Sequence, residues 1–244
     1  MKHATQLLFV VAFATTTALA AEIRVLSAAA AKGPMAEIAA AFERETGNCV
    51  VFEFTTAGQV ESRLAAGARP DIVVNTRARL AAQAANRNGI VRDLGTVRIG
   101  VAARAGSPRP DISTVDAFRA ALLAAQSVAF TDPAAGGTAG THFAGVLDRL
   151  GIADVMAGKR RLAADGLDVM RKIQKGEAEL GITQVSEILL VERTTFVGPM
   201  PESLQSPTIY SAFVPEAASP ATRAFADALT SAAGRARFDA AGFE

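Results

Sequence analysis

The chain has 244 residues, of which 50% are hydrophobic, with 25 lysines and arginines against 24 aspartates and glutamates. This near-neutral balance argues against binding to nucleic acid or to acidic membrane surfaces, because both require an excess of positive charge. With one cysteine and two histidines in the sequence, an internal disulfide and a His/Cys metal cluster are excluded.

The first twenty residues, MKHATQLLFVVAFATTTALA, have the pattern of a secretory signal peptide. A short basic start leads into a largely apolar run, and Ala18-Leu19-Ala20 forms an A-x-A cleavage site. The alternative is a membrane anchor, but three threonines interrupt the run, and it is short against the ~20 apolar residues that span a bilayer. We therefore expect a periplasmic protein, cleaved near Ala20, whose basic and acidic side chains are equal in number.

Strands and helices alternate from residue 22 onward. Short apolar runs predict strands at 22–30, 48–54 and 71–75, and amphipathic segments predict helices at 35–47, 58–67 and 77–89. Alternation in units of this length predicts α/β architecture, with a mostly parallel sheet and helices on both of its faces.

A strand over 97–106, followed by the break SPRPD, precedes a second series of elements. After the break we expect helices at 114–125, 140–151 and 165–176, strands at 127–132, 178–184 and 207–215, and two helices within 220–243. The expected division is a first lobe of residues 21–98 plus 207–244 and a second lobe of residues 99–206. Because the chain crosses between the lobes twice, we expect a hinge, with a cleft for a small ligand between them.

Several segments, in this order, resemble the periplasmic molybdate-binding proteins of ABC importers. They are IRVLSAAAAKGPMAEIAAAFERETG near the start, FTDPAAGGTAG at 130–140, IQKGEAELGITQVSEIL at 173–189 and PATRAFADALTSAAGRARFDAAGFE at the end. The similarity covers nearly the whole mature chain. It implies a two-lobed type II periplasmic-binding-protein fold with two crossover hinge segments, which closes on a small anion and delivers it to an ABC permease in the inner membrane.

The side chains that hold molybdate in that family are mostly replaced here. The family uses serine hydroxyls in the first two loops, backbone amides, and a tyrosine hydroxyl. At the matching positions this chain has Ala30, the run Thr55-Thr56-Ala57, and Gln184. The resemblance thus implies the fold of the family. Of the side chains that bind molybdate in the family, it implies only a threonine hydroxyl in the second loop of this chain.

The loops at the carboxyl ends of the strands are the expected ligand face, because helix N-termini and free amides there favour an anion. Cationic side chains in or beside these loops suit a flat carboxylate better than a tetrahedral oxyanion. The candidate ligand-binding residues are Ala30, Ala31, Lys32, Thr55, Thr56, Ala57, Arg77, Arg79, Thr138, Ala139, Gly140, Thr141, His142 and Gln184. For the charged residues the alternative is a solvated surface position, and for the threonines of 138–141 a helix cap.

Enzyme chemistry is not expected. The stretch GGTAGT (136–141) lacks the G-K-[ST] ending of a nucleotide-binding loop. Cys49 begins an apolar strand, so we expect it in the core and not paired with His142. The prediction is a monomeric binding protein without a cofactor, whose small anionic ligand is an organic di- or tricarboxylate ahead of molybdate or tungstate. The alternative of another class is a ligand-sensing receptor domain.

Overall fold

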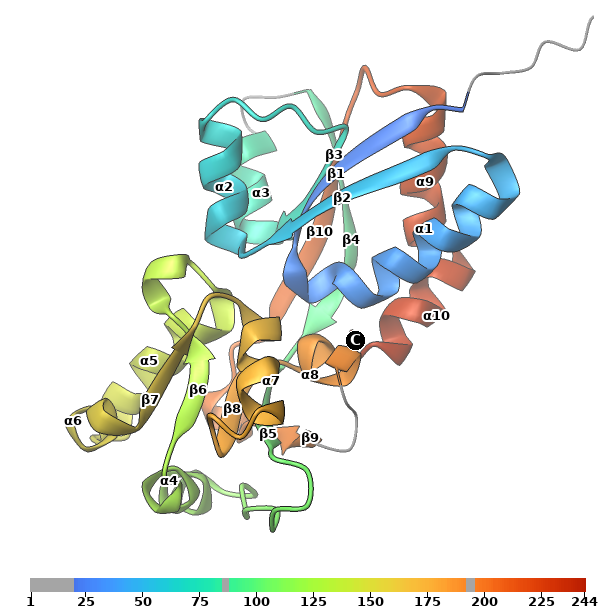
Figure 1. Cartoon of the computed structure of the whole chain (residues 1–244). Helices are drawn as coiled ribbons and strands as arrows, with labels where there is room; N and C mark the ends of the chain where they lie inside the picture. Colours follow the sequence, from blue (N-terminus) through green and yellow to red (C-terminus); the bar gives the residue numbers. More distant parts are fainter. Residues whose placement is uncertain (1–19, 85–87, 192–195) are drawn as a thin grey trace, which may run out of the picture.

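The structure is a computed structural model that describes residues 20–84, 88–191 and 196–244. The expected signal peptide, apart from Ala20, lies outside the described residues. Two five-stranded sheets form two lobes, one above the other in Figure 1. Within the described ranges, the helices are all too short or too polar to cross a membrane.

The first sheet has the strand order β2-β1-β3-β10-β4. Its strands are β1 (Glu22–Ala28), β2 (Cys49–Thr55), β3 (Ile72–Thr76), β4 (Gly89–Val97) and β10 (Thr208–Pro215). β1 pairs parallel with β2 and β3, whereas β10 pairs antiparallel with β3 and β4. The sheet is therefore mixed, because its late strand arrives from the other lobe and runs in the opposite direction.

Helices cover both faces of this sheet (Figure 1). On one face lie α1 (Lys32–Thr46), α9 (Pro220–Thr230) and α10 (Ala232–Ala240), and on the other lie α2 (Ala57–Ala65) and α3 (Arg77–Ala84). Within β3, Ile72 and Val74 pack with the first group, while Val73 packs with the second. This is why β3 reads as a continuous apolar run, as strands buried on both faces do.

The second sheet has the strand order β7-β6-β8-β5-β9. Its strands are β5 (Ile99–Ala103), β6 (Val128–Thr131), β7 (Arg160–Ala163), β8 (Leu180–Gln184) and β9 (Phe196–Pro199). Its helices are α4 (Val115–Ala124), α5 (Thr138–Arg149), α6 (Ala153–Met156), α7 (Gly166–Gln174) and α8 (Val185–Val191). A core of edge-to-face rings, Phe118, Phe130 and Phe143, joins α4 and α5 to β6.

The chain crosses between the sheets at Arg98 and again between β9 and β10. Polar contacts tie the two crossings together. The Arg98 guanidinium lies 2.6 Å from a Glu202 carboxylate oxygen, and the Gln205 side chain bonds both the amide and the carbonyl of Ile99. The crossings therefore lie side by side and form one hinge region.

Two expectations fail in the first lobe. The helix expected over 77–89 is shorter, and β4 begins at Gly89, where no strand was expected. β4 is an edge strand with mostly exposed or half-buried residues, so its sequence lacks a strong apolar pattern. Cys49 is exposed and not in the core, because β2 is the opposite edge strand and its alternate side chains face solvent.

Candidate functional site

A cavity lies between the two lobes, at the carboxyl ends of β1, β2, β6 and β8. It has about 330 Å³ of open space between its lining atoms. A cavity of this size suits a small ligand. The short turn η1 (Ala29–Ala31) and the first residues of α5 line the cavity. The free N–H groups at the start of a helix favour negative charge.

Half of the sequence-predicted site residues line this cavity. They are Ala30, Thr55, Thr56, Ala57, Thr138, Ala139 and Gln184. These residues come from four loops that are far apart in the sequence. The expectation that loops after the strands converge on one place therefore agrees with the geometry, for the loops that follow β1, β2, β6 and β8.

Four other predicted residues line a neighbouring, wider groove. This outer groove has about 1260 Å³ of open space, and it runs between α3, α5 and the hinge residues 207–209. Its predicted members are Arg77, Arg79, Thr141 and His142, and Thr138 lines both the inner cavity and the outer groove. Thr138 thus marks the point where the two spaces adjoin.

The remaining three predicted residues line neither space. Ala31 is fully buried beneath the turn that follows β1. The Lys32 ammonium lies 5.7 Å from the centre of the Phe54 ring, a cation–π contact. Gly140 packs against β6 so closely that a Cβ there would lie 2.0 Å from the Thr131 carbonyl oxygen. A packing role accounts for each of them.

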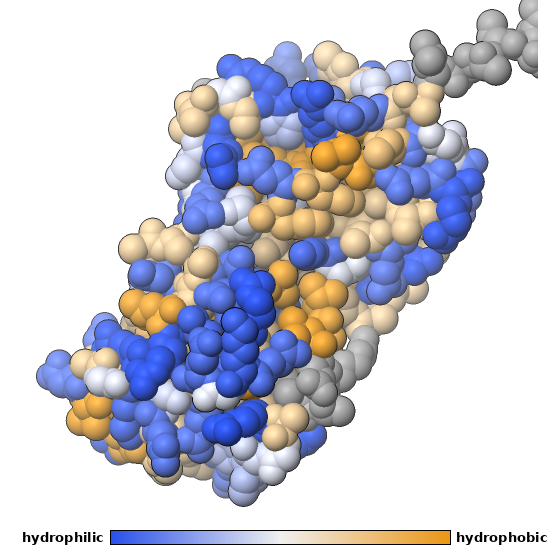
Figure 2. All heavy atoms as spheres, in the orientation of Figure 1, coloured by the Kyte–Doolittle hydropathy of each residue, from blue (hydrophilic) through white to orange (hydrophobic). Residues whose placement is uncertain are grey.

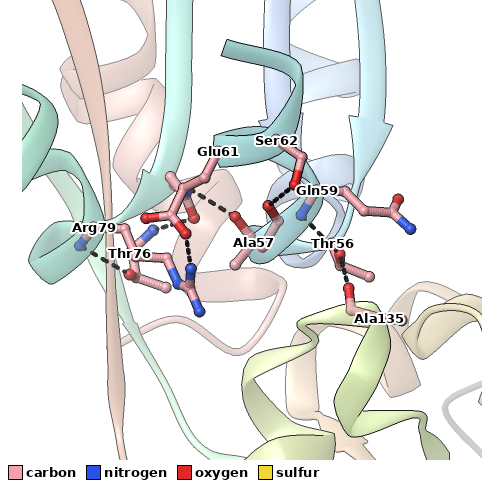
Figure 3. A network of polar contacts seen from close by, with 10 residues as sticks. Thr56, Ala57, Gln59, Glu61, Ser62, Thr76, Arg79 and Ala135 are labelled. Carbon is pink, nitrogen blue, oxygen red and sulfur yellow. Dashed lines mark hydrogen bonds and ion pairs between the residues drawn. The ribbon is translucent and has the colours of Figure 1, made fainter. Parts of the chain in front are cut away.

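The predicted cations are already engaged by other groups. Arg77 pairs with Asp93 on β4, and Arg79 pairs with Glu61 on α2, as Figure 3 shows for the second pair. His142 places its Nε2 2.7 Å from the Leu204 carbonyl oxygen, so that nitrogen carries a proton and donates. Among the described residues, neither lysine nor arginine lines the inner cavity.

The lobes touch directly at the rim of the inner cavity. The Thr56 hydroxyl donates to the Ala135 carbonyl across the gap, and the Gly58 N–H donates to the Gly136 carbonyl at 3.1 Å. Figure 3 shows the first of these bonds running from the start of α2 to the loop before α5. A Cβ on Gly58 would lie 2.9 Å from the Gly136 Cα, so glycine permits this approach. The structure is therefore closed over the cavity.

Glu187, on the first turn of α8, is a cavity residue that sequence reasoning missed. Its side chain is buried, and the Thr183 hydroxyl donates to its Oε2 at 2.5 Å. Gly166 leaves room for the carboxyl, since a Cβ there would meet Oε2 at 1.9 Å. Burial raises the pKa of Glu187 to about 7, and the nearby Asp165 carboxylate adds to the increase. The available signal was an acid in the otherwise apolar run VSEILLV.

Tyr210, on β10, was also missed and brings a hydroxyl into the cavity from the first lobe. Gln184 donates from Nε2 to this hydroxyl at 3.4 Å. Burial raises the pKa of Tyr210 above its usual value, so the hydroxyl stays protonated and can donate. The family's tyrosine position carries Gln184 here, and Tyr210 places a phenol beside it from another strand.

Within the described structure Gln184 Oε1 has no hydrogen-bond partner, and the Thr138 hydroxyl has only the neighbouring Tyr210 hydroxyl. Buried polar atoms are nearly always hydrogen-bonded, so Gln184 Oε1 is free to accept a bond from a further group in the cavity. Asp165 and Gly166 add the N-terminus of α7, where the Asp165 side chain accepts from the Asp168 N–H. Nowhere in the described ranges do three or more His, Cys, Asp or Glu side chains gather as a metal site.

The family profile described as "Bacterial extracellular solute-binding protein" matches residues 23–244. An aconitate isomerase from Pseudomonas sp. is 33% identical over 216 residues, which is 81% of this chain and 79% of that one. The molybdate-binding protein ModA of Escherichia coli is 26% identical over 214 residues, 85% of this chain and 83% of that one. The solved periplasmic molybdate-binding protein of Azotobacter vinelandii aligns with a TM-score of 0.71 at 18% identity, covering 91% of this chain and 98% of its own.

Proposed function

The chain belongs to the bacterial extracellular solute-binding protein family, of the molybdate-binding type, and from that premise we propose that it captures a small organic di- or tricarboxylate in the periplasm. The ligand lies in the inner cavity, contacts both lobes and stabilises their closed arrangement by its differential affinity. The closed protein, a monomer, then presents the ligand to an ABC permease.

The observation that carries this proposal is the chemistry of the inner cavity. Molybdate at neutral pH is a compact dianion that only accepts hydrogen bonds. In the cavity, molybdate would lie near the carboxyls of Glu187 and Asp165, which are acceptors themselves. No described lysine or arginine lines the cavity. An organic acid with one carboxyl still protonated, or with a hydroxyl, can donate to these acceptors, and its carbon skeleton can contact the apolar part of the wall.

The apolar part of the lining supports the same ligand class. Methyl groups of the alanines at 28–30, 57 and 139 face the cavity. Of these, Ala30 and Ala57 stand where the molybdate-binding family has serines, and the methyl groups suit C–H groups. They also keep water away from the polar contacts, which strengthens them.

The outer groove offers places for further carboxylates. Arg77 and Arg79 lie there beside Thr141 and His142, and Thr138 connects the groove with the inner cavity. Each guanidinium is paired with a partly exposed carboxylate, a contact that contributes little and can be exchanged. A tricarboxylate can place one end in the cavity and another carboxylate against these arginines.

The proposal is tested by thermal denaturation of the mature protein with single ligands. A ligand that binds the folded protein stabilises it by mass action, by about 2.7 kcal/mol at a ligand concentration of a hundred times Kd. This stabilisation raises the midpoint temperature of unfolding. We expect stabilisation by aconitate, citrate or the saturated analogue tricarballylate. Stabilisation by molybdate and tungstate alone would contradict it and favour the molybdate alternative.

A second candidate function is catalysis on the captured acid, as in the Pseudomonas relative that is named an aconitate isomerase. The specific observation in its favour is Glu187, a buried carboxyl with a near-neutral pKa that lines the cavity. Incubation of the protein with cis- or trans-aconitate tests it. Formation of the other isomer favours the enzyme, and an unchanged acid favours capture alone.

A further inference from the structure

We propose that Glu187 is a catalytic residue, which removes a proton from one carbon of an unsaturated polycarboxylate in the inner cavity and returns it to another carbon. This inference rests on the proposed function, since Glu187 can act only on an acid that the cavity holds. It adds a reaction, a reacting group and a substrate class: acids with a C–H group next to a carbon–carbon double bond and a carboxylate.

The position of Glu187 suits such a role. Its carboxyl lines the cavity although the residue is only 6% exposed, so bulk water has little access to it. Thr183 holds Oε2 by a 2.5 Å hydrogen bond, and Gly166 packs against the same oxygen. The Gln184 backbone N–H also donates to the carboxyl, and together these contacts orient the group.

The groups that surround Glu187 make it the carboxyl in the cavity that can act as a general base. From α7, Asp165 faces it, but that carboxylate caps the helix and lies 3.7 Å from the Arg171 guanidinium. From β10, Tyr210 faces it as a neutral hydroxyl. Arg79, the cation whose field reaches Tyr210, is paired with Glu61. No described cation therefore neutralises Glu187 directly, and its pKa of about 7 lets it both accept and release a proton near neutral pH.

The reaction balances within the substrate and Glu187. Ionised Glu187 takes a proton from the methylene carbon of a propene tricarboxylate such as aconitate. The C–H electron pair forms a new double bond to the middle carbon, and the old double-bond pair moves to the far carbon. Glu187 returns the proton to that far carbon. One C–H bond breaks and one forms, without oxidant or cofactor, and the new double bond can adopt the other geometry.

The other cavity groups stabilise the charge that develops. In the intermediate, negative charge spreads over the three-carbon unit and its carboxylates. The Tyr210 hydroxyl and the Thr138 hydroxyl, which contact each other, lie in the same cavity as neutral donors. Fixed donors in a nearly water-free site stabilise such charge strongly.

The experiment follows trans-aconitate in D₂O by proton NMR with the purified mature protein. We expect isomerisation together with deuterium uptake at the two carbons that exchange protons. Glu187→Gln should lower the rate by at least about 100-fold, because general acid–base catalysis contributes about 10²–10⁴. Glu177→Gln, at an exposed position outside the cavity, is the matched control and should leave the rate unchanged.

Two further measurements separate catalysis from structure. Calorimetry with tricarballylate, which has no double bond, should show that Glu187→Gln still folds and binds. The wild-type rate should rise with pH as Glu187 loses its proton, and Thr183→Val should move this profile to higher pH, because the Thr183 hydrogen bond lowers the pKa of Glu187.

The outcomes distinguish this inference from the proposed function. Wild-type protein that binds tricarballylate but neither isomerises aconitate nor exchanges its protons would overturn the role of Glu187 and leave capture intact. Equal rates for wild type and Glu187→Gln would also overturn it. Protein that binds none of the carboxylates would remove the proposed function, and the inference with it.

Discussion

Glu187 lies in a cavity whose described lining holds no cationic side chain, so burial works against its charge. A carboxyl in this state is protonated over a wider pH range in the folded chain than in the unfolded chain. Its ionisation state therefore links ligand binding, chemistry and stability at one residue. Two predictions belong to this scale.

Glu187→Gln should change how stability depends on pH. The wild-type pKa is about 7 when folded and 4.5 in the reference state, so the folded chain binds the extra proton between these values. Its contribution is fully present below pH 4.5 and is lost as pH rises through 7. Urea unfolding should show wild type losing about 3 kcal/mol relative to Glu187→Gln across this range, at about 1.4 kcal/mol per pKa unit. Parallel curves for the two proteins would refute the prediction.

Thr138→Val should change stability and binding in opposite directions. The Thr138 hydroxyl is buried and has only the Tyr210 hydroxyl as a partner, so the isosteric methyl group removes a weakly satisfied polar group. Unfolding free energy should stay the same or rise by about 1 kcal/mol. Tricarballylate affinity should fall about tenfold, the value of one ordinary hydrogen bond. Urea unfolding and calorimetry measure the two effects, and a loss of stability with unchanged affinity would show that the hydroxyl has only a structural role.

At the scale of elements, the contact between the start of α2 and the loop before α5 closes the cavity. Gly58 and Gly136 approach so closely that an added Cβ would meet the opposite backbone, and Gly136 also has a φ of +72°. Closure therefore depends on backbone fit, supported by the hydrogen bonds of Thr56 and Gly58.

Gly58→Ala should hold the lobes apart by a few tenths of an ångström and weaken tricarballylate binding tenfold or more. Gly145→Ala is the matched control, because a Cβ on that exposed α5 residue meets nothing within 4 Å. The control should bind as wild type does, and it should be slightly more stable, since alanine is the better helix former. Calorimetry on both variants measures this. Equal affinity in Gly58→Ala and wild type would mean that the contact is not needed for binding.

The sequence predicted most elements and the convergence of their loops, because strand–helix alternation determines where strand ends meet. It failed where the apolar pattern is weak, as in the edge strand β4, and where burial depends on sheet order, as for Cys49. Glu187 and Tyr210 were missed for a related reason. The two residues line one cavity only because the two lobes fold against each other. The local sequences VSEILLV and PTIYSAF do not indicate that contact.

At the scale of the whole molecule, two mixed sheets are joined by a short double crossing and meet around the cavity. Figure 2 shows a mixed surface, in which small groups of hydrophobic residues lie on both lobes and one of them lies near the place where the lobes meet. The Arg98 guanidinium bridges Glu202 and Glu244 at this crossing, and the half-exposed ion pairs stabilise it by at most about 1 kcal/mol. We expect these pairs to restrain the hinge only weakly, so that a ligand can determine how far the lobes close.

Small-angle scattering should report this motion. The ligand-loaded monomer should have a radius of gyration of about 17 Å, as expected for a compact chain of this length. Without ligand, the radius should be larger. Identical profiles with and without tricarballylate would contradict a hinge that responds to the ligand.

The central claim is that the inner cavity takes an organic polycarboxylate in preference to an inorganic oxyanion. Titration calorimetry of the mature protein with tricarballylate and with molybdate, at the same pH and salt, tests it most directly. We predict saturable one-to-one binding of tricarballylate, weakened about tenfold by Thr138→Val, and molybdate binding that is at least tenfold weaker. Tight molybdate binding with no heat from tricarballylate, citrate or aconitate would contradict the account.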